Sequence, residues 1–327
     1  MKLTIDNPIL YHILKILANS NMPLGAKSIS EKLEERGFQV KKETVQYYLK
    51  LLDELGLTKK VGLAGRVISE KGLEEVKKGM VRERIGSFIE LREEYAYNAN
   101  FDPFKRRGLV SLNIGIIRKK DLELSLELIK ACMDAKLAVS RLVKIYEREA
   151  GNLKIPKGKV GIGLVSTSVV DAALIGSRIS SFPTFAGILQ YSDWKPLRFV
   201  HAISYYGSTL DPIDLFIRSG FCSVKDAVER GSGNVPADVR EIPLVLRKRA
   251  VEIVEQLEKI GINGAVYISG AENDALGIPV NNYRAGVVVI AGSTPLVYLK
   301  EKGIDVEIKI LAAFERIENL EEIDSLT

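Results

Sequence analysis

The first 80 residues contain three short helical segments followed by a hairpin, and this order constrains the fold more than any other feature of the chain. Apolar residues recur at helical spacing in three segments separated by breaks of a few residues, at 7–19, 26–37 and 41–55. Two short β-prone runs follow, at 57–61 and 66–69, and the stretch between them has glycine at both ends, where a hairpin needs positive φ. Few folds bury a single core with these elements in this order.

The order predicts a winged helix. In that fold the second and third helices form a helix-turn-helix, and the hairpin after them is the wing. Pro8 suits the first turn of the first helix, Gly37 and Gly56 stop the second and third, and residues 69–73 open a fourth. The alternative interpretation is a generic helical bundle with a surface hairpin.

A winged helix places its third helix and its wing against DNA. Helix geometry turns Tyr47 and Lys50 away from the apolar stripe of the third helix, and Gln46 flanks the exposed side. Gln can pair with adenine and Lys with guanine or phosphate, while a basic wing contacts the backbone or the minor groove. The predicted DNA contacts are Lys42, Gln46, Tyr47, Lys50, Lys59, Lys60 and Arg66. Each could instead be an ordinary solvated side chain, and some winged helices bind proteins.

Positive charge is concentrated in this segment. Residues 1–80 hold 14 Lys and Arg against 10 Asp and Glu, a net of +4, whereas the whole chain carries +5. Nucleic-acid binding needs such a concentration, because Lys and Arg replace the counterions around the phosphates. The excess of positive charge is modest, so the prediction of DNA binding rests on the helix pattern and not on the charge.

The length of the chain predicts at least two domains, because 327 residues exceed what one core usually holds. We expect a winged helix at 1–79, a linker helix and loop at 80–108, and an α/β domain at 109–327. The linker ends in Lys105-Arg106-Arg107, which is either a solvated loop or an additional phosphate contact.

Composition excludes several classes of protein. The sequence has no run of about 18 apolar residues, so no membrane helix is expected, and its start does not fit a signal peptide. With Cys132 and Cys222 as the only cysteines, no disulfide framework is expected and a cytoplasmic location is favoured. Two histidines and two cysteines make a poor zinc site, so no metal is predicted.

From residue 109 onward, strands alternate with helices, which predicts a mixed α/β (α+β) layered domain. The expected strands are 109–117, 160–166, 185–190, 199–204, 265–269, 285–290 and 306–314, and the expected helices are 122–133, 169–179, 213–219, 243–260 and 295–301. A faint echo, in which 163–166 and 186–189 resemble 266–269 and 285–288, indicates either two related halves or a coincidence.

One candidate ligand segment lies where the strand beginning at Gly161-Ile162-Gly163 ends in Ser166-Thr167-Ser168 and a helix starts. The segment matches neither the dinucleotide fingerprint nor the P-loop. Hydroxyls and free amides at a helix N-terminus nevertheless suit an anion. The alternative is a simple N-cap by Ser166 or Ser168.

A second candidate segment runs from 199 to 212, where a strand meets a Gly-Ser-Thr turn before a helix capped by Asp211. Its predicted ligand contacts are His201, Gly207, Ser208, Thr209 and, in the following helix, Arg218. His201 could instead be an ordinary core or interface histidine. No nucleophile–base–acid set is visible, so binding is favoured over catalysis.

The order of these parts, together with Tyr-Gly-Ser-Thr-Leu-Asp-Pro-Ile-Asp-Leu-Phe-Ile at 206–217, resembles the archaeal nitrogen-regulatory repressor family NrpR. The strand end at 161–168 and Phe182-Pro183 with Ala186-Gly187 carry the same resemblance. It implies a repressor of nitrogen-assimilation genes that binds palindromic operator DNA as a homodimer or higher oligomer, with no cofactor, and is released by 2-oxoglutarate. The larger domain would then serve ligand sensing and dimerisation, and the protein would not be an enzyme.

The sequence departs from the family pattern at two places. Some members carry two copies of the ligand domain, whereas this chain has room for one, and Ser166-Thr167 stands where the family often has Cys-Ser. The predicted 2-oxoglutarate contacts are Ser166, Thr167, Ser168, His201, Gly207, Ser208, Thr209 and Arg218. One alternative is a winged-helix transcription factor that senses a different small metabolite. The other is an enzyme domain with an appended winged helix, with His201, Asp211 and Cys222 as the reactive candidates.

Overall fold

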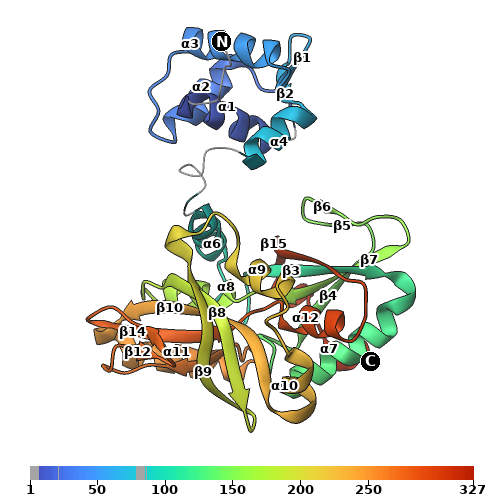
Figure 1. Cartoon of the computed structure of the whole chain (residues 1–327), viewed down its shortest axis with the longest axis vertical. Helices are drawn as coiled ribbons and strands as arrows, with labels where there is room; N and C mark the ends of the chain where they lie inside the picture. The colour runs from blue at the N-terminus through green and yellow to red at the C-terminus, as the bar shows by residue number, and fades with distance from the viewer. Residues whose placement is uncertain (1–6, 21, 79–84, 86) are drawn as a thin grey trace. The chain divides into compact units, whose positions relative to one another are not determined.

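The computed structural model describes residues 7–20, 22–78, 85 and 87–327, and the chain divides into two compact units, Met1–Ile85 and Gly86–Thr327 (Figure 1). The described residues of each unit bury their own apolar core. The fold class expected from the sequence, a winged helix followed by a larger mixed α/β domain, is confirmed.

The N-terminal unit is a winged helix. Its elements are α1 (Pro8–Ala18), α2 (Ala26–Glu34), α3 (Lys42–Glu54), β1 (Thr58–Val61), β2 (Gly65–Ile68) and α4 (Glu70–Lys78). Asn7 caps α1, because its Oδ1 accepts the N–H of Ile9 at 2.9 Å while Pro8 occupies the first turn. The helices share a core whose fully buried members are Ile13, Leu14, Ile29, Leu33, Val45, Leu49 and Leu52.

The wing is fastened to the helices through β2. The backbones of Arg66 and Leu24 exchange two hydrogen bonds of 2.9 Å, so β2 is held to the segment that precedes α2. Gly65 has φ +125°, and a side chain there would collide with the carbonyl of Leu24. Only glycine fits this position, which explains why the hairpin has glycine at its second strand.

The connecting region differs from the expected linker. Residues 79–84 and 86, which are the last residue of the expected winged helix and part of the expected linker, lie outside the described residues. Helix α6 (Ser87–Asn98) and the loop after it are part of the second unit, because Ile89, Arg92 and Phe101 are all buried there. The sequence assigned these residues to a linker because α6 is charged along its length and its buried arginine is not an apolar signal.

The second unit contains two antiparallel sheets of five strands. The order in the first is β15 (Glu307–Arg316), β3 (Leu109–Arg118), β7 (Lys159–Val165), β4 (Leu142–Tyr146) and β16 (Glu321–Glu322). The order in the second is β11 (Ala265–Ile268), β14 (Arg284–Ile290), β10 (Gly233–Pro243), β8 (Phe182–Ser192) and β9 (Lys195–Ser204). Two small hairpins accompany them, β5 (Glu149–Ala150) with β6 (Leu153–Lys154) and β12 (Asp274–Ala275) with β13 (Ile278–Pro279).

The helices of this unit are α6 and six others among the described residues. These are α7 (Leu122–Asp134), α8 (Ser168–Gly176), α9 (Pro212–Arg218), α10 (Val224–Arg230), α11 (Arg247–Lys259) and α12 (Thr294–Glu301). All of the strands and helices expected beyond residue 109 are present. The expectation missed β4, β10, β16, α10 and the two small hairpins.

The second unit contains two halves that share one order of elements, and β9 (Lys195–Ser204), α9 and α10 stand between them. Each half has a long strand, a helix, a strand, a small hairpin, a strand, a helix and a final strand. The helices α7 and α11 begin at Leu122 and Arg247, and the strands β7 and β14 begin at Lys159 and Arg284, in both cases 125 residues apart. The two related halves considered from the sequence are therefore real, but β7 corresponds to β14 and not to 266–269.

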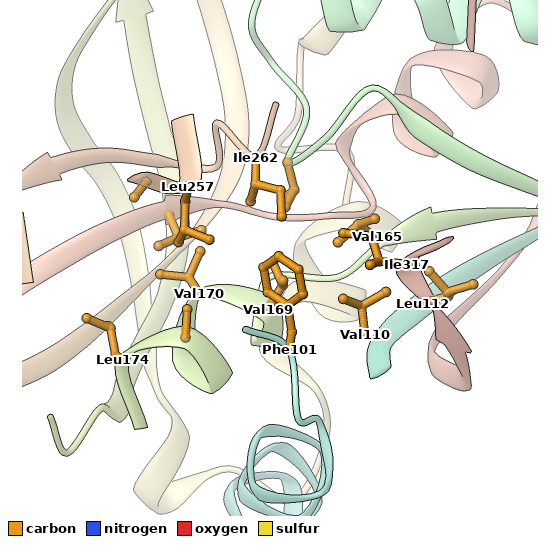
Figure 2. Packing of buried hydrophobic residues seen from close by; sticks show 14 of the residues in the cluster. Phe101, Val110, Leu112, Val165, Val169, Val170, Leu174, Leu257, Ile262 and Ile317 are labelled. Atoms are coloured by element: carbon orange, nitrogen blue, oxygen red, sulfur yellow. The ribbon is translucent and has the colours of Figure 1, made fainter. Parts of the chain in front are cut away.

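The two halves exchange their final strands. Strand β8, which ends the first repeat, pairs with β10 of the second, and β15, which ends the second, pairs with β3 of the first. A shared apolar core lies where the halves meet. Figure 2 shows Phe101 in this core among side chains of β3, β7, α8 and α11, including Val110, Val165, Val169 and Leu257.

Candidate functional site

The exposed side of α3 presents the side chains that the sequence predicted to contact DNA. Lys42, Gln46, Tyr47 and Lys50 are all exposed, on the side opposite the buried Val45 and its neighbours. The side chain of Tyr47 is 63% exposed, so it is available to a partner and contributes little to the core. The helix therefore offers an amide, a phenol and two ammonium groups on one surface.

The three basic residues of the wing differ in exposure and in ion pairing. Lys59 and Lys60 are exposed, but the Nε of Arg66 lies 2.7 Å from Oδ2 of Asp53 in α3, and its side chain is 16% exposed. Asp53 also accepts the hydroxyl of Thr58. In the free protein Arg66 thus fastens the wing to α3, whereas Lys59 and Lys60 remain available for a phosphate.

The tip of the wing carries an exposed apolar side chain that the sequence analysis did not single out. Leu63 is fully exposed between β1 and β2. An apolar side chain on a hairpin tip can enter a minor groove or wedge against a base step. Its only signal in the sequence was a leucine between two turn glycines.

A buried polar cluster centred on Asp238 occupies the interior of the second unit. Asp238 is fully buried on β10, and its Oδ2 lies 2.9 Å from Nη2 of Arg92 in α6. The same carboxylate accepts the Thr167 hydroxyl at 3.3 Å and the Tyr205 hydroxyl. One carboxylate therefore joins α6, the β7–α8 junction and the end of β9.

A second buried arginine lies beside this carboxylate. Arg240 is fully buried, with its Nε 2.7 Å from Oδ1 of Asp171 in α8 and its Nη2 3.9 Å from Asp238. None of its three guanidinium nitrogens makes a hydrogen bond of good geometry with the described residues. Asp171 is held in turn by Ser181, whose hydroxyl donates at 2.6 Å. Arg240 therefore retains unused donor capacity in the interior.

The ionisation of the cluster is strongly perturbed. Burial raises the pKa of Asp211 to about 6, with Arg92 opposing the rise and Asp238 adding to it. Burial lowers the pKa of the Arg92 guanidinium, but Asp238 and the neighbouring acidic groups outweigh it, so the net shift is upward. Burial also raises the pKa of Tyr205 well above its ordinary range, so it donates as a neutral phenol.

The first predicted ligand segment lies against this cluster. Ser166, Thr167 and Ser168 are at most 3% exposed, and α8 begins among them. The hydroxyl of Ser168 pairs with that of Ser111 on β3, while Thr167 contacts Asp238. The N-cap by Ser166 considered from the sequence is present as a long hydrogen bond, because Ser166 Oγ accepts the N–H of Ser168 at 3.5 Å. Thr167, the residue directly before α8, makes no side-chain capping hydrogen bond.

The second predicted segment reaches the cluster through residues other than those predicted. Tyr205 and Asp211 point inward, whereas His201 and Gly207 are exposed. The ring of His201 packs on Phe221 at 4.6 Å, so it is a surface histidine and not a core one. The predicted contacts of this segment are therefore not gathered with Ser166, Thr167 and Ser168.

Three further predicted contacts also lie outside the cluster. Ser208 hydrogen-bonds the backbone of Leu210 in its own turn, and Thr209 is half-buried beside it. Arg218 is 71% exposed and its Nε lies 2.7 Å from Oδ2 of Asp214. This exposed pair leaves Arg218 far less constrained than the two buried arginines.

The three residues considered for an appended enzyme have separate environments. Asp211 caps α9 by accepting the N–H of Ile213 at 2.9 Å, and His201 packs on Phe221. Burial raises the pKa of Cys222 to about 12, which holds it as a thiol. No hydrogen bond or ion pair between described residues joins the three, and the described part of the chain contains no cluster of three potential metal ligands.

Two pockets of the second unit have no lining residue among Arg92, Thr167, Tyr205, Asp238 and Arg240. A pocket of about 260 Å³ beside the 206–217 stretch is lined in part by Ser204, Tyr206, Glu241 and Asn281. The carboxylate of Glu241 in its wall disfavours an anion. A pocket of about 970 Å³, lined in part by Trp194, contains none of the predicted ligand residues.

Sequence reasoning missed the residues that organise the cluster. Arg92, Asp238 and Arg240 lie on elements that were assigned to a linker or not predicted at all. The available signal was three charged residues within 238–241, which is typical of a solvated strand or loop, but here all four residues are buried. Within the described residues, no helix is long and apolar enough to span a membrane.

Comparisons with known proteins match both units. A family model described as "NrpR regulatory domains NRD1 and 2" matches residues 85–322, and one described as "Ribonuclease R winged-helix domain" matches residues 11–76. A solved nitrogen repressor-like protein from Methanococcus jannaschii shares 26% identity and a TM-score of 0.61. That alignment covers 72% of this chain and 97% of the other.

Two curated relatives align with almost the whole chain. The global nitrogen regulator NrpRI of Methanosarcina mazei is 32% identical over 96% of this chain and 97% of its own length. The global nitrogen regulator NrpR of Methanocaldococcus jannaschii is 34% identical over 96% of this chain, which spans 55% of that longer protein.

Proposed function

The chain belongs to the NrpR family of nitrogen regulators, and on that premise we propose that it is a DNA-binding transcriptional repressor of nitrogen-assimilation genes, released from its operator by 2-oxoglutarate. The observation that carries the proposal is the pairing, in one chain, of a winged helix with an exposed basic side and a separate regulatory unit. The relatives are named as regulators, and we propose a regulator and not an enzyme.

The proposed DNA contacts are the exposed members of the predicted set. Gln46 and Lys50 on α3 suit adenine and guanine edges, and Lys59 and Lys60 on the wing suit phosphates. Because two such units are needed to read the two halves of a palindrome, we propose that the protein binds its operator as a homodimer or a higher oligomer.

For the effector we favour the interior group, Ser166, Thr167 and Ser168. Hydroxyls and the start of α8 lie there beside Arg240, which has unused donors. Asp171 and Asp238 hold the two buried arginines in place, and a carboxylate of the effector would bind the Arg240 donors that they leave unused. The remaining predicted contacts, His201, Gly207, Ser208, Thr209 and Arg218, form a surface group. This group is a weaker site for the effector, because the exposed Arg218 is already paired with Asp214.

Mobility shift of the full chain on DNA upstream of nitrogen-assimilation genes, with and without 2-oxoglutarate, tests the function. We expect a specific complex that 2-oxoglutarate dissociates and that succinate, a dicarboxylate without the keto group, leaves intact. Absence of a complex would refute the DNA-binding role. Release by another metabolite, found in a thermal-shift screen, would instead support a transcription factor with a different effector.

Calorimetry with 2-oxoglutarate tests the location of the site. An interior site predicts that Thr167→Val weakens binding at least tenfold, while Arg218→Ala leaves it within about twofold. The reverse pattern would move the effector to the surface group with His201, Gly207, Ser208 and Thr209.

A further inference from the structure

A basic loop on the regulatory unit has no role in the function proposed above. Residues 99–108 follow α6, and the tip of this loop carries Phe104, Lys105, Arg106 and Arg107. The side chain of Phe104 is 65% exposed, and the three basic residues are exposed beside it. Three adjacent exposed cations form a local concentration of positive charge, which favours an anionic partner.

The loop is fixed by contacts with the core and with α11. Phe101 is 3% exposed and lies in the centre of the shared core (Figure 2). Asn100 Oδ1 accepts the N–H of Leu109 at 2.7 Å, and Nε2 of Gln256 in α11 donates to the carbonyl of Pro103 at 3.4 Å. The tip is thus fixed at both ends and from one side.

The turn at the tip is also fixed from within. Asp102 Oδ1 accepts the N–H groups of Phe104 and Lys105 at 2.9 and 3.1 Å, and the Asp102 N–H donates to the carbonyl of Arg107 at 3.0 Å. Arg106 has φ +50°, a conformation that turns the chain at the tip. These contacts present the basic side chains on a preformed turn, which reduces the entropy lost when they bind.

The arginines of the loop are free to take a partner. Lys105 lies 3.1 Å from Asp102, but Arg106 and Arg107 form no ion pair with the described residues. Arg107 and Lys105 line a pocket of about 430 Å³ with Arg316, which is likewise unpaired, at the end of β15. Because Asp102 and Glu318 also line it, the surface carries a net positive charge only through the unpaired guanidinium groups.

We propose that residues 104–107, together with Arg316, form a second contact with the phosphate backbone of duplex DNA, independent of base sequence. Unpaired guanidinium groups on a rigid turn suit phosphate oxygens, which they bind through paired N–H groups. Duplex DNA is the anion that this chain meets through its winged helix, so the inference rests on the DNA-binding part of the proposed function. An acidic protein surface is the competing partner.

Binding of the full chain to a 45-base-pair duplex selected by it from a random pool tests the proposal. The test variant is Arg106→Ala/Arg107→Ala, and the matched control is Lys248→Ala/Arg249→Ala, two adjacent exposed cations on α11 of the same unit. Fluorescence anisotropy between 50 and 200 mM salt gives the slope of log K against log salt. Fluorescence of Trp194 during thermal unfolding shows that both variants are folded.

We expect the test variant to reduce the magnitude of the salt slope by about 1.8 for each bound protomer, and thus by about 3.6 for a dimer, because each lost phosphate contact removes about 0.9. The weakening should be the same on the selected duplex and on a shuffled one, since phosphate contacts carry no base information. The control should keep the wild-type slope, and Arg106→Lys/Arg107→Lys should restore most of it.

Two results would overturn the inference without touching the proposed function. One is a wild-type slope in the test variant, which would favour an acidic protein as the partner. The other is an equal loss in the control, which would mean that only net charge matters. If the wild-type chain binds neither duplex, the proposed function fails and this inference fails with it.

Discussion

Arg92 and Asp238 form a buried ion pair, 2.9 Å between Nη2 and Oδ2, that joins the first helix after the boundary between the units to the middle strand of a sheet. The side chains are 9% and 0% exposed. Removing either partner leaves the other charge in the interior, which is usually strongly destabilising. The pair therefore fixes α6 and is sensitive to any change at Thr167 or Tyr205, which share the same carboxylate.

Asp238→Ala should destabilise the regulatory unit by about 3–5 kcal/mol, because Arg92 loses its partner in the interior. Urea unfolding followed by the fluorescence of Trp194 measures this unit selectively, since Trp194 is the only tryptophan and lies in the β8–β9 turn. Asp214→Ala, which breaks the exposed Arg218 pair, is the matched control and should cost less than about 0.5 kcal/mol. Equal effects of the two variants would contradict the role given to Asp238.

The stability of the regulatory unit should fall between pH 4 and pH 7 through Asp211. Its pKa is about 6 in the folded protein against an ordinary value of 3.8, so the folded state binds the extra proton in this range. The stabilisation is complete below the unfolded pKa and is lost as the pH rises through 6, an effect of about 3 kcal/mol. Asp211→Asn keeps a capping oxygen for Ile213 but does not titrate.

Urea unfolding of wild type and Asp211→Asn at several pH values checks this sign. The variant should match wild type near pH 4 and be more stable at pH 7.5. A variant that loses stability relative to wild type as the pH rises would show that the carboxylate is ionised and stabilising in the folded unit.

Lys50→Ala/Lys60→Ala should weaken binding to duplex DNA at physiological salt by at least tenfold and leave both units folded, because both side chains are exposed. Arg66→Ala should act differently. It should lower the melting temperature of the winged helix, since the residue holds the wing to Asp53. Circular dichroism beside anisotropy separates the two effects, and unchanged DNA binding in the double variant would remove α3 and the wing from the interface.

Phe101→Ala should destabilise the regulatory unit by about 3–5 kcal/mol, the usual range for removing a buried phenylalanine. The ring lies in the shared core between the two halves, as Figure 2 shows. Phe104→Ala, three residues later and exposed, is the control and should change stability by less than about 0.5 kcal/mol. A small effect at Phe101 would mean that the core relaxes around the vacancy.

The fold could be predicted from the sequence wherever apolar spacing decides it. The three helical stripes of the N-terminal unit and the turn glycines of the wing produced the winged helix that the structure shows. Strands β7 and β14 were equally clear, because both are buried runs of glycine and aliphatic residues. In these segments the local preference for helix or strand agrees with the observed burial, so the apolar pattern is sufficient to predict the element.

Strand β10 could not be predicted because its pattern contradicts its position. It contains Pro236, Asp238 and Arg240, yet it lies in the middle of a sheet and its central residues are buried. The two charges are tolerated only because Arg92 and Asp171 come from distant helices to neutralise them. Such compensation depends on tertiary contacts, and no window of sequence around β10 contains it.

The candidate site could be predicted only in part, because the sequence shows where its segments lie but not which side chains turn inward. Ser166, Thr167 and Ser168 follow a clear strand and were found by their place at a helix start. The second segment was found, but the inward side chains are Tyr205 and Asp211 and not His201 or Ser208. Tyr205 lies in the short 3₁₀ turn after β9 and Asp211 is the N-cap of α9, so neither follows the alternation of a strand, and the sequence alone could not assign which side chains turn inward.

The exchange of final strands between the halves also determines the order in which the two units can fold during translation. Leu109 on β3 pairs with Arg316 on β15, 207 residues later, so one edge of β3 stays unpaired until β15 emerges. At a translation rate of about 5–20 residues per second that wait is about 10–40 s. The winged helix, whose core lies within a short stretch of chain, can fold on the ribosome meanwhile. A nascent chain would therefore carry a finished winged helix before the second unit could complete its fold.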